Sequence, residues 1–432
     1  MPTQGASKVP LWLRKLQAAW RQGRAHLMRP FVLFFCAGDR GDQPLLTRSP
    51  VQCDESKPTC SRCAASRFHC SYSRGAAAAL QPAYTSVFPV GLPHILPAPP
   101  PHLRIPVASP VPGQFGEYEL RPRDYERLSR FAQRSVMTMG SGATRRLFPA
   151  WSLRLASANP FLCHVYLAFS LLHDLYLSPG SSSTPAHRAS LAFHWYHATA
   201  ILNHKLADPQ PPDSPSERDA LMTSASMLAA SAFANVEDAS DPEKAWPLRP
   251  AGPSDLDWLR MSDGKKVVRD LSGPLPPDSF FRRIFDDLGR LFLPDGQPPP
   301  PIPPDALPPA FFSLYDLACP HAPDRSPYYL AAFLLARLLR LDASSEDLSP
   351  HFGAFLLQLD ARLRALLHVK DPRALLLLAW WYAKTLQHTA WWLRCRGLVE
   401  GRAICIHLER RCGQDARVAE LLRFPKTAFG LV

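Results

Sequence analysis

Four cysteines within eighteen residues constrain the fold of this chain most. Cys53, Cys60, Cys63 and Cys70 stand at C-x6-C-x2-C-x6-C spacing, while only six of the ten cysteines lie in the other 414 residues. A C-x2-C turn lets two thiolates converge on one ion, and zinc takes four such ligands in a tetrahedron. A segment this short cannot fold by burying apolar surface, whereas bound metal can fold it. The spacing therefore predicts a zinc site built from these four thiolates, rather than four unrelated buried thiols.

The same segment resembles the fungal binuclear zinc cluster, the DNA-binding module of fungal transcription activators. In that family six cysteines bind two zincs, with the pattern C-x2-C-x6-C, a loop that usually holds a proline, and a second C-x2-C-x6-C. The resemblance implies that Cys53 is the third cysteine and Cys60 the fourth, which bridges both metals. Cys63 and Cys70 are then the fifth and sixth, and Pro58 is the loop proline.

The chain departs from the family pattern upstream of Cys53. The first two cysteines should fall at positions 43 and 46, which are Gln43 and Leu46, and the basic helix that reads bases in the family is missing as well. Three explanations are open. Residues 1–50 are a misread exon and the native chain has the whole cluster, or the chain binds one zinc through four cysteines, or Cys36 serves as a fifth ligand.

Charge is concentrated at the start of the chain. The net charge is +12, and residues 1–80 contribute +8, from twelve Lys or Arg and four acids. A basic end is typical of proteins that bind a polyanion. The resemblance implies that this partner is DNA and that the protein acts in the nucleus. Arg62, Arg67 and Arg74 are candidates for contacts with DNA phosphates, or else belong to a solvated basic face. The acid-free stretch from Lys8 to Arg29 also resembles a mitochondrial presequence, which a misread exon explains equally well.

Composition divides the rest of the chain. We expect an atypical basic segment at 1–50, the partial zinc cluster at 51–74, an extended linker rich in proline and alanine at 75–116, and a globular domain at 117–432. The longest clean apolar run has ten residues, which is too short to span a membrane. No secretory signal is evident, so the cysteines indicate a reducing compartment.

The globular domain reads as all-α. Ser, Thr or Asn followed by proline opens several segments with helical periodicity, which is the preferred start of a helix. We expect helices at about 122–139, 160–178, 185–206, 215–235, 279–292, 327–341, 350–367, 372–391 and 397–411, with a short one near Ser254 and Asp257. The helix at 160–178 is apolar nearly all round and should be central. Prolines 294 to 309 predict a surface loop, and no alternating strand pattern is found.

This domain is also similar to the regulatory domain of fungal zinc-cluster factors of the sterol uptake control type. The matching stretches are 194–202, 245–250, 253–260 and 371–381. The resemblance implies a helical domain with an apolar pocket for a hydrophobic ligand such as a sterol. A homodimer stays open, because no run of three or more heptads follows the cluster.

Signals for catalysis are weak. His187, His194, His197 and His204 fall on about a third of one helix circumference, which favours core or boundary histidines over a metal site, since no H-E-x-x-H appears. Trp380, Trp381, Trp391 and Trp392 read as core, or alternatively as the lining of a ligand cavity. No nucleophile elbow, Walker or dinucleotide pattern is present.

The sequence therefore predicts a zinc-cluster transcription regulator of RNA polymerase II genes and not an enzyme. The alternative is a ligand-binding or scaffold protein that has lost sequence-specific DNA binding.

Overall fold

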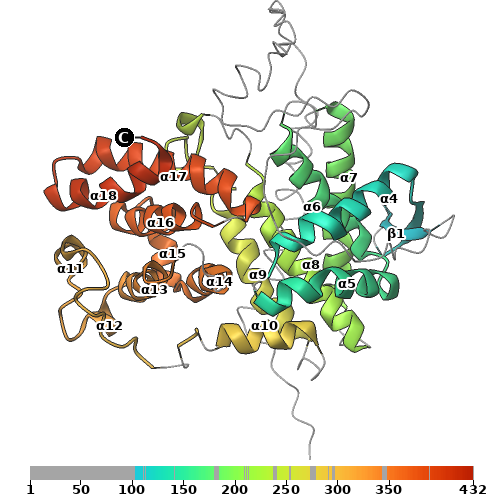
Figure 1. Ribbon diagram of the computed structural model, residues 1–432, viewed down its shortest axis with the longest axis horizontal. Helices are drawn as coiled ribbons and strands as arrows, with labels where there is room; N and C mark the ends of the chain where they lie inside the picture. Colours follow the sequence, from blue (N-terminus) through green and yellow to red (C-terminus); the bar gives the residue numbers. More distant parts are fainter. Residues whose placement is uncertain are drawn as a thin grey trace, which may run out of the picture. The chain divides into compact units, whose positions relative to one another are not determined.

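The computed structural model describes residues 103–431, except 110, 112, 141, 180–183, 209, 211, 213, 237–240, 253, 273–278, 290, 294–296, 343–347 and 389. All of these residues belong to one compact unit. This unit is mostly helical (Figure 1), which confirms the predicted fold class.

A β-hairpin opens the described chain. Strand β1 (Arg104–Ala108) pairs antiparallel with β2 (Phe115–Glu119), and the register places Ile105 opposite Tyr118. Ile105 is 1% exposed, so this part of the stretch predicted as an extended linker contributes to the core. The sequence did not predict these strands, because each has only five residues and Pro106 interrupts the first, and a proline argues against a paired strand.

The first predicted helix changes its pitch along its length. Helix α4 (Pro122–Arg130) continues as one π-helical turn at Phe131–Ser135 and a 3-10 turn at Val136–Thr138. Gly140 then takes a left-handed φ of +76°, which confirms the predicted stop. Helix α5 (Gly142–Ala158) was not predicted, because Pro149 lies inside it and prolines usually end helices.

The next three helices follow the prediction closely. They are α6 (Leu162–Leu177), α7 (Pro185–Ala207) and α8 (Pro215–Ala234). The side chain of Thr184 caps α7, and that of Ser214 caps α8. Every residue from 162 to 173 is buried, which confirms that α6 is central.

The remaining helices differ more from the prediction. They are α9 (Asp257–Ser272), α10 (Phe280–Gly289), α11 (Pro309–Tyr315), α12 (Ala322–Arg325), α13 (Tyr329–Leu339), α14 (Leu348–Gln358), α15 (Ala361–His368), α16 (Pro372–Thr385), α17 (Trp391–Cys412) and α18 (Ala416–Phe429). The expected helix at 350–367 is two helices, because Asp360 caps a new start at residue 361. Helix α9 is longer than expected, α17 begins six residues early, and α18 was not predicted.

The proline-rich segment before α11 is only partly a surface loop. Ile302, Ala306 and Leu307 are 6%, 8% and 4% exposed and belong to a hydrophobic core. The prediction was wrong for these side chains, because proline content reports the backbone and does not exclude apolar side chains from a core.

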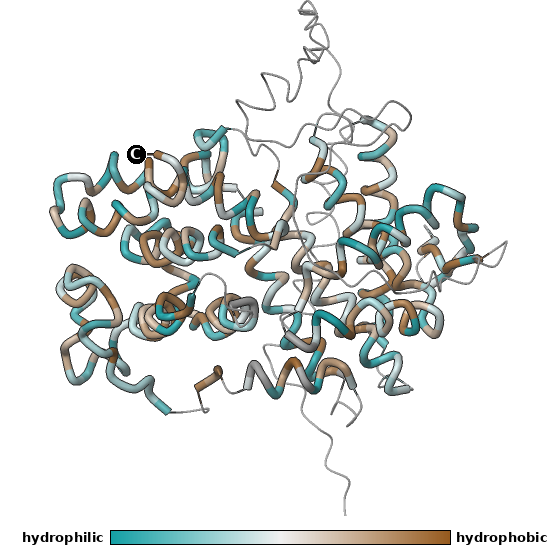
Figure 2. Tube along the Cα trace, viewed as in Figure 1, coloured by the Kyte–Doolittle hydropathy of each residue, from teal (hydrophilic) through white to brown (hydrophobic). Residues whose placement is uncertain are grey.

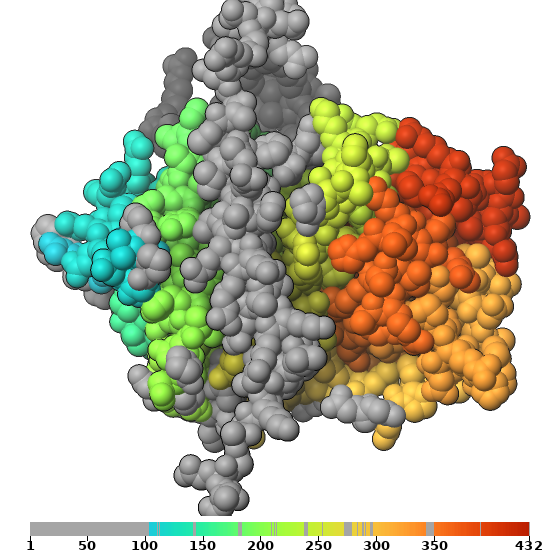
Figure 3. Space-filling view, turned by 180° about the vertical axis from the view of Figure 1, so that it is seen from behind, coloured from blue at the N-terminus to red at the C-terminus, as the bar shows by residue number. Residues whose placement is uncertain are grey.

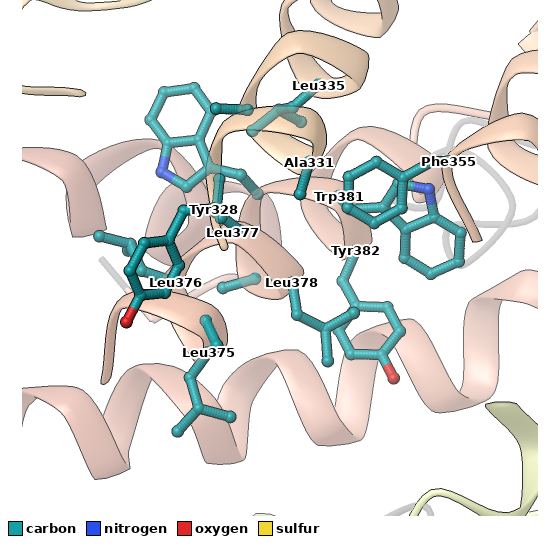
Figure 4. Close-up of a cluster of buried hydrophobic side chains, with 14 of the residues drawn as sticks. Tyr328, Ala331, Leu335, Phe355, Leu375, Leu376, Leu377, Leu378, Trp381 and Tyr382 are labelled. Atoms are coloured by element: carbon teal, nitrogen blue, oxygen red, sulfur yellow. The ribbon is translucent and has the colours of Figure 1, made fainter. Parts of the chain in front are cut away.

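Two large hydrophobic clusters stabilise the unit. One gathers side chains of the hairpin and of α5 to α8, and the other those of α9, α11 and α13 to α18. Figure 4 shows Leu375, Leu376, Leu377 and Leu378 of α16 pointing to several sides of the helix, each among apolar neighbours. Helices α17 and α18 alternate between apolar and polar residues along the chain (Figure 2), as expected where one face meets a core.

Helices α8 and α17 contribute to both clusters. Phe233 of α8 belongs to the second cluster although most of α8 packs in the first, and Trp391 of α17 belongs to the first. Arg396 of α17 bonds to the C-terminal end of α8. Its guanidinium donates hydrogen bonds to the carbonyls of Ala232, Phe233 and Asn235 at 3.2, 3.0 and 2.9 Å.

A buried ion pair lies beside this contact between α8 and α17. Arg396 pairs with Glu400 one turn along α17, and the Tyr382 hydroxyl donates to the second carboxylate oxygen at 2.7 Å. The side chains of Arg396 and Glu400 are 13% and 6% exposed. Each charge therefore depends on the other for compensation inside the protein.

Candidate metal centre and nucleic-acid interface

The predicted metal ligands and phosphate contacts lie outside the described residues. They are Cys53, Cys60, Cys63 and Cys70, with Arg62, Arg67 and Arg74. The chemistry of this donor set fits zinc, since four thiolates complete one tetrahedral shell. It does not complete a six-thiolate cluster, because Gln43 and Leu46 stand where the first two cysteines would be.

The two buried cysteines of the described helices are poor metal ligands. Burial raises the pKa of both Cys163 and Cys405 to about 12, so these thiols stay protonated at neutral pH. Among the residues that the structure describes, no group of three or more His, Cys, Asp or Glu side chains could hold a metal ion.

The histidines of α7 separate into buried and exposed members. His194 and His197 are 1% and 7% exposed, His187 is half-buried, and His204 lies at the surface. Helix α6 adds His164, fully buried, which the sequence did not associate with the others because it lies thirty residues away. The structure thus confirms core histidines, and brings together a histidine cluster of His164, His194 and His197.

Hydrogen-bond partners fix where the protons of this cluster lie. His164 Nε2 is 3.1 Å from the Pro106 carbonyl, which can only accept, so this nitrogen donates. The Nδ1 of neutral His164 therefore accepts from Nδ1 of His194 at 2.9 Å. On the other side, Nδ1 of His197 accepts the backbone N–H of Ala108 at 3.1 Å.

A buried carboxylate faces the cluster. Asp124 of α4 accepts from the Tyr118 hydroxyl at 2.7 Å, from the Arg121 N–H at 3.0 Å and from Arg127 at 3.1 Å. Its Oδ1 lies 3.8 Å from Nε2 of His194. Burial acts to raise the pKa of Asp124, but the nearby donors outweigh it and hold the pKa below its ordinary value.

Burial keeps the histidines neutral. It lowers the pKa of His164 to about 3 and that of His197 to about 4. The pKa of His194 is also lowered by burial, although Asp124 partly offsets the shift. Neutral rings can accept as well as donate, so the cluster holds the β1 backbone against α6 and α7.

The tryptophans of α16 and α17 pack in the two cores. Trp381 is fully buried and stacks on Phe355 at 5.6 Å between ring centroids. Trp380 donates its indole N–H to the Leu421 carbonyl at 2.8 Å, and Trp391 stacks on His173 at 4.5 Å. These contacts favour core packing for the described tryptophans over the lining of a ligand cavity.

A pocket of about 320 Å³ lies elsewhere, beside the hairpin. It is lined by Pro106, Phe115, Phe161, Ile201, His204, Lys205, Asp208, Gln210, Pro212, Glu217 and Leu221. Lys205 and Glu217 form an ion pair at its wall. This pocket could not be predicted from the sequence, because its residues come from both strands, from α7 and α8, and from the segments between them.

Comparison with known proteins identifies the cysteine-rich segment. Residues 47–77 match the family described as the fungal Zn(2)-Cys(6) binuclear cluster domain. No curated protein matches the chain. The match begins after positions 43 and 46, and it includes all four cysteines of the segment. None of the described helices is long and apolar enough to cross a bilayer. The chain therefore carries a zinc-binding domain of the fungal Zn(2)-Cys(6) type, the DNA-binding module of a fungal zinc-cluster transcription regulator.

Proposed function

We propose that this protein is a nuclear regulator of RNA polymerase II genes, which contacts DNA through the segment at 51–74 and is controlled through its helical domain. The observation that carries the proposal is the C-x6-C-x2-C-x6-C spacing inside the family match at 47–77. Zinc supplies the fold of this segment, because bound metal replaces the hydrophobic core that it lacks.

Arg62, Arg67 and Arg74 would then contact phosphates. Such contacts position a protein on the duplex and carry no sequence information of their own. Replacing Arg67 by Ala should weaken binding by a similar factor on every duplex, and should reduce the dependence of log K on log salt concentration by about 1.

The helical domain is proposed as the regulatory part. Its extensive cores and its likeness to regulatory domains of the sterol uptake control type support a role in sensing a ligand or partner. A hydrophobic ligand such as a sterol is the finer proposal, and it rests on residue likeness alone. Saturable binding of a fluorescent sterol to the full chain would support it, and the absence of such binding would remove it.

Zinc content and DNA selection test the main proposal. Four thiolates hold one zinc, so we expect about one zinc per chain and enrichment of particular sequences from a random duplex pool. Cys60→Ser should lose both. Cys319→Ser is the matched control, because Cys319 is an exposed free cysteine of the helical unit, and it should lose neither.

The second candidate is a ligand-binding or scaffold protein without sequence-specific DNA binding. The missing cysteines at positions 43 and 46 favour it. It predicts a zinc-loaded chain that binds random duplexes as well as any selected one, and that result would overturn the main proposal.

A further inference from the structure

Side chains of α6 and α7 cover one edge of the β-hairpin. Backbone hydrogen bonds join Ser109 to Gln114 and Leu120 to Leu103. Hydrogen-bonded and non-hydrogen-bonded pairs alternate along an antiparallel ladder, so the backbone N–H and C=O groups of residues 104, 106 and 108 point away from β2. The carbonyl of Pro106 accepts from His164, and the N–H of Ala108 donates to His197. Proline has no N–H at this register, so these two contacts satisfy the outward groups of Pro106 and the N–H of Ala108.

The other edge of the hairpin is open. The same alternation turns the backbone N–H and C=O groups of Phe115 and Glu117 away from β1. Within the described part of the chain these groups have no hydrogen-bond partner. Both residues are exposed (Phe115 at 43%), and the cyan atoms of the hairpin and α4 lie at the surface in Figure 3. An open edge of this kind can pair with another extended chain.

Phe115 of β2 also lines the pocket described above, whose other residues come from β1, the turn before α6, α7, α8 and the loop between α7 and α8. Pro106 and Phe115 belong to its wall and share one face of the hairpin, since alternate residues of a strand point to the same side. Ile201 of α7, Leu221 of α8 and Phe161, which directly precedes α6, supply apolar surface. When a peptide adds to a sheet edge, backbone hydrogen bonds provide affinity and such pockets select side chains.

The charges around the edge and the pocket favour a basic partner. The acidic side chains on the outward hairpin face and the pocket wall are Glu117, Glu119, Asp208 and Glu217, and the basic ones are Arg104 and Lys205. Four acids against two bases leave a net charge of −2. Arg104 pairs with Glu117, but both side chains are more than half exposed, which weakens that pair.

We propose that the open edge of β2 binds an extended basic peptide of a partner protein as a third strand, with an apolar side chain of the peptide in the adjacent pocket. This interaction surface is independent of the zinc segment and of DNA binding. Nucleic acid is a poor occupant, because its phosphates meet a net acidic surface. A second copy of the chain is also disfavoured, since antiparallel self-pairing centred on Glu117 places this residue opposite its own copy.

Anisotropy of a fluorescein-labelled peptide tests the proposal on the full chain. The probe alternates Lys with Val or Thr, and a matched peptide has Glu in place of each Lys. We expect saturable binding of the basic peptide and at least tenfold weaker binding of the acidic one. The absence of saturable binding, or equal binding of both peptides, overturns the proposal.

Glu117→Pro removes the outward N–H at the centre of the edge. Pro106 already occupies the opposite position, so the register accepts a proline without loss of a hydrogen bond between the strands. Loss of one backbone hydrogen bond should weaken peptide binding about three- to tenfold, while the far-ultraviolet spectrum and the thermal midpoint stay unchanged.

Two charge variants separate the contribution of the backbone hydrogen bond from that of the side-chain charge. Glu117→Gln keeps the N–H and should weaken binding only at low salt. Glu126→Gln makes the same charge change on the exposed side of α4, away from the edge, and should leave binding unchanged. Equal affinity of Glu117→Pro and the parent chain overturns the proposal. A dimer in sedimentation that Glu117→Pro dissociates overturns it in favour of a second copy.

Discussion

Removal of Arg396 should cost the protein more than removal of both members of its ion pair. Arg396→Met deletes the three hydrogen bonds to the end of α8 and leaves the carboxylate of Glu400 without its cation. The Glu400 side chain is only 6% exposed, so water cannot replace the guanidinium. Breaking a buried pair from one side costs about 3–5 kcal/mol. We expect the free energy of unfolding to fall by about 4 kcal/mol.

The double variant makes this test specific. Glu400→Gln keeps an acceptor for the Tyr382 hydroxyl but carries no charge. Added to Arg396→Met, it should restore about 1–2 kcal/mol, because it removes the uncompensated buried charge. Arg394→Met is the control, since Arg394 is exposed two residues away and, among the described residues, donates only to the Leu386 carbonyl. Its effect should stay within about 0.5 kcal/mol.

Urea unfolding at neutral pH, followed by tryptophan fluorescence, measures all four chains. A double-mutant cycle then gives the interaction between Arg396 and Glu400. The reasoning fails if the double variant is no more stable than Arg396→Met, or if Arg394→Met costs as much as Arg396→Met.

Three further perturbations have defined outcomes. Burial lowers the pKa of His197 to about 4 from an ordinary 6.5, so the unfolded chain binds the proton more readily than the folded chain. Stability is therefore lost as pH falls from about 6.5 to about 4. His197→Asn keeps an acceptor but does not titrate, so it should flatten the dependence of the thermal midpoint on pH. Gly401→Ala would place Cβ 2.3 Å from Cζ of Phe429, and overpacking should cost about 1–3 kcal/mol in urea unfolding, whereas a neutral result would mean that the ring moves freely. Asp371→Ala removes the cap that accepts the N–H of Ala374 at 2.9 Å and the hydroxyl of Tyr328 at 3.0 Å, and should lower stability by about 1–2 kcal/mol by the same measurement, with Asp371→Asn, which keeps an acceptor oxygen, nearly neutral.

Helix positions were predictable where the chain marks the start of a helix explicitly. Thr184 and Ser214 each precede a proline, and both cap helices as their sequence predicts. Prediction failed where local rules conflict with tertiary packing. Pro149 is accommodated inside α5, and Pro106 lies in a strand where its outward carbonyl accepts from His164 of a distant helix.

The candidate sites show the same limit. The cysteine cluster was evident from spacing alone, because its ligands are close in sequence. The histidine cluster was only half visible, since the periodicity of α7 identifies His194 and His197 but cannot place His164 beside them. The open β2 edge had no sequence signal, because it depends on which side of a hairpin the helices cover.

The sharing of α8 and α17 between the two cores limits how this domain can be divided. Trp391 packs with the first cluster while Leu393 and Leu408 of the same helix pack with the second. A division of the chain between the two clusters would therefore remove packed side chains from both cores. The helical unit should therefore unfold as one cooperative block and resist recombination into smaller modules, so that insertions and swaps are tolerated at its loops and not at its midpoint.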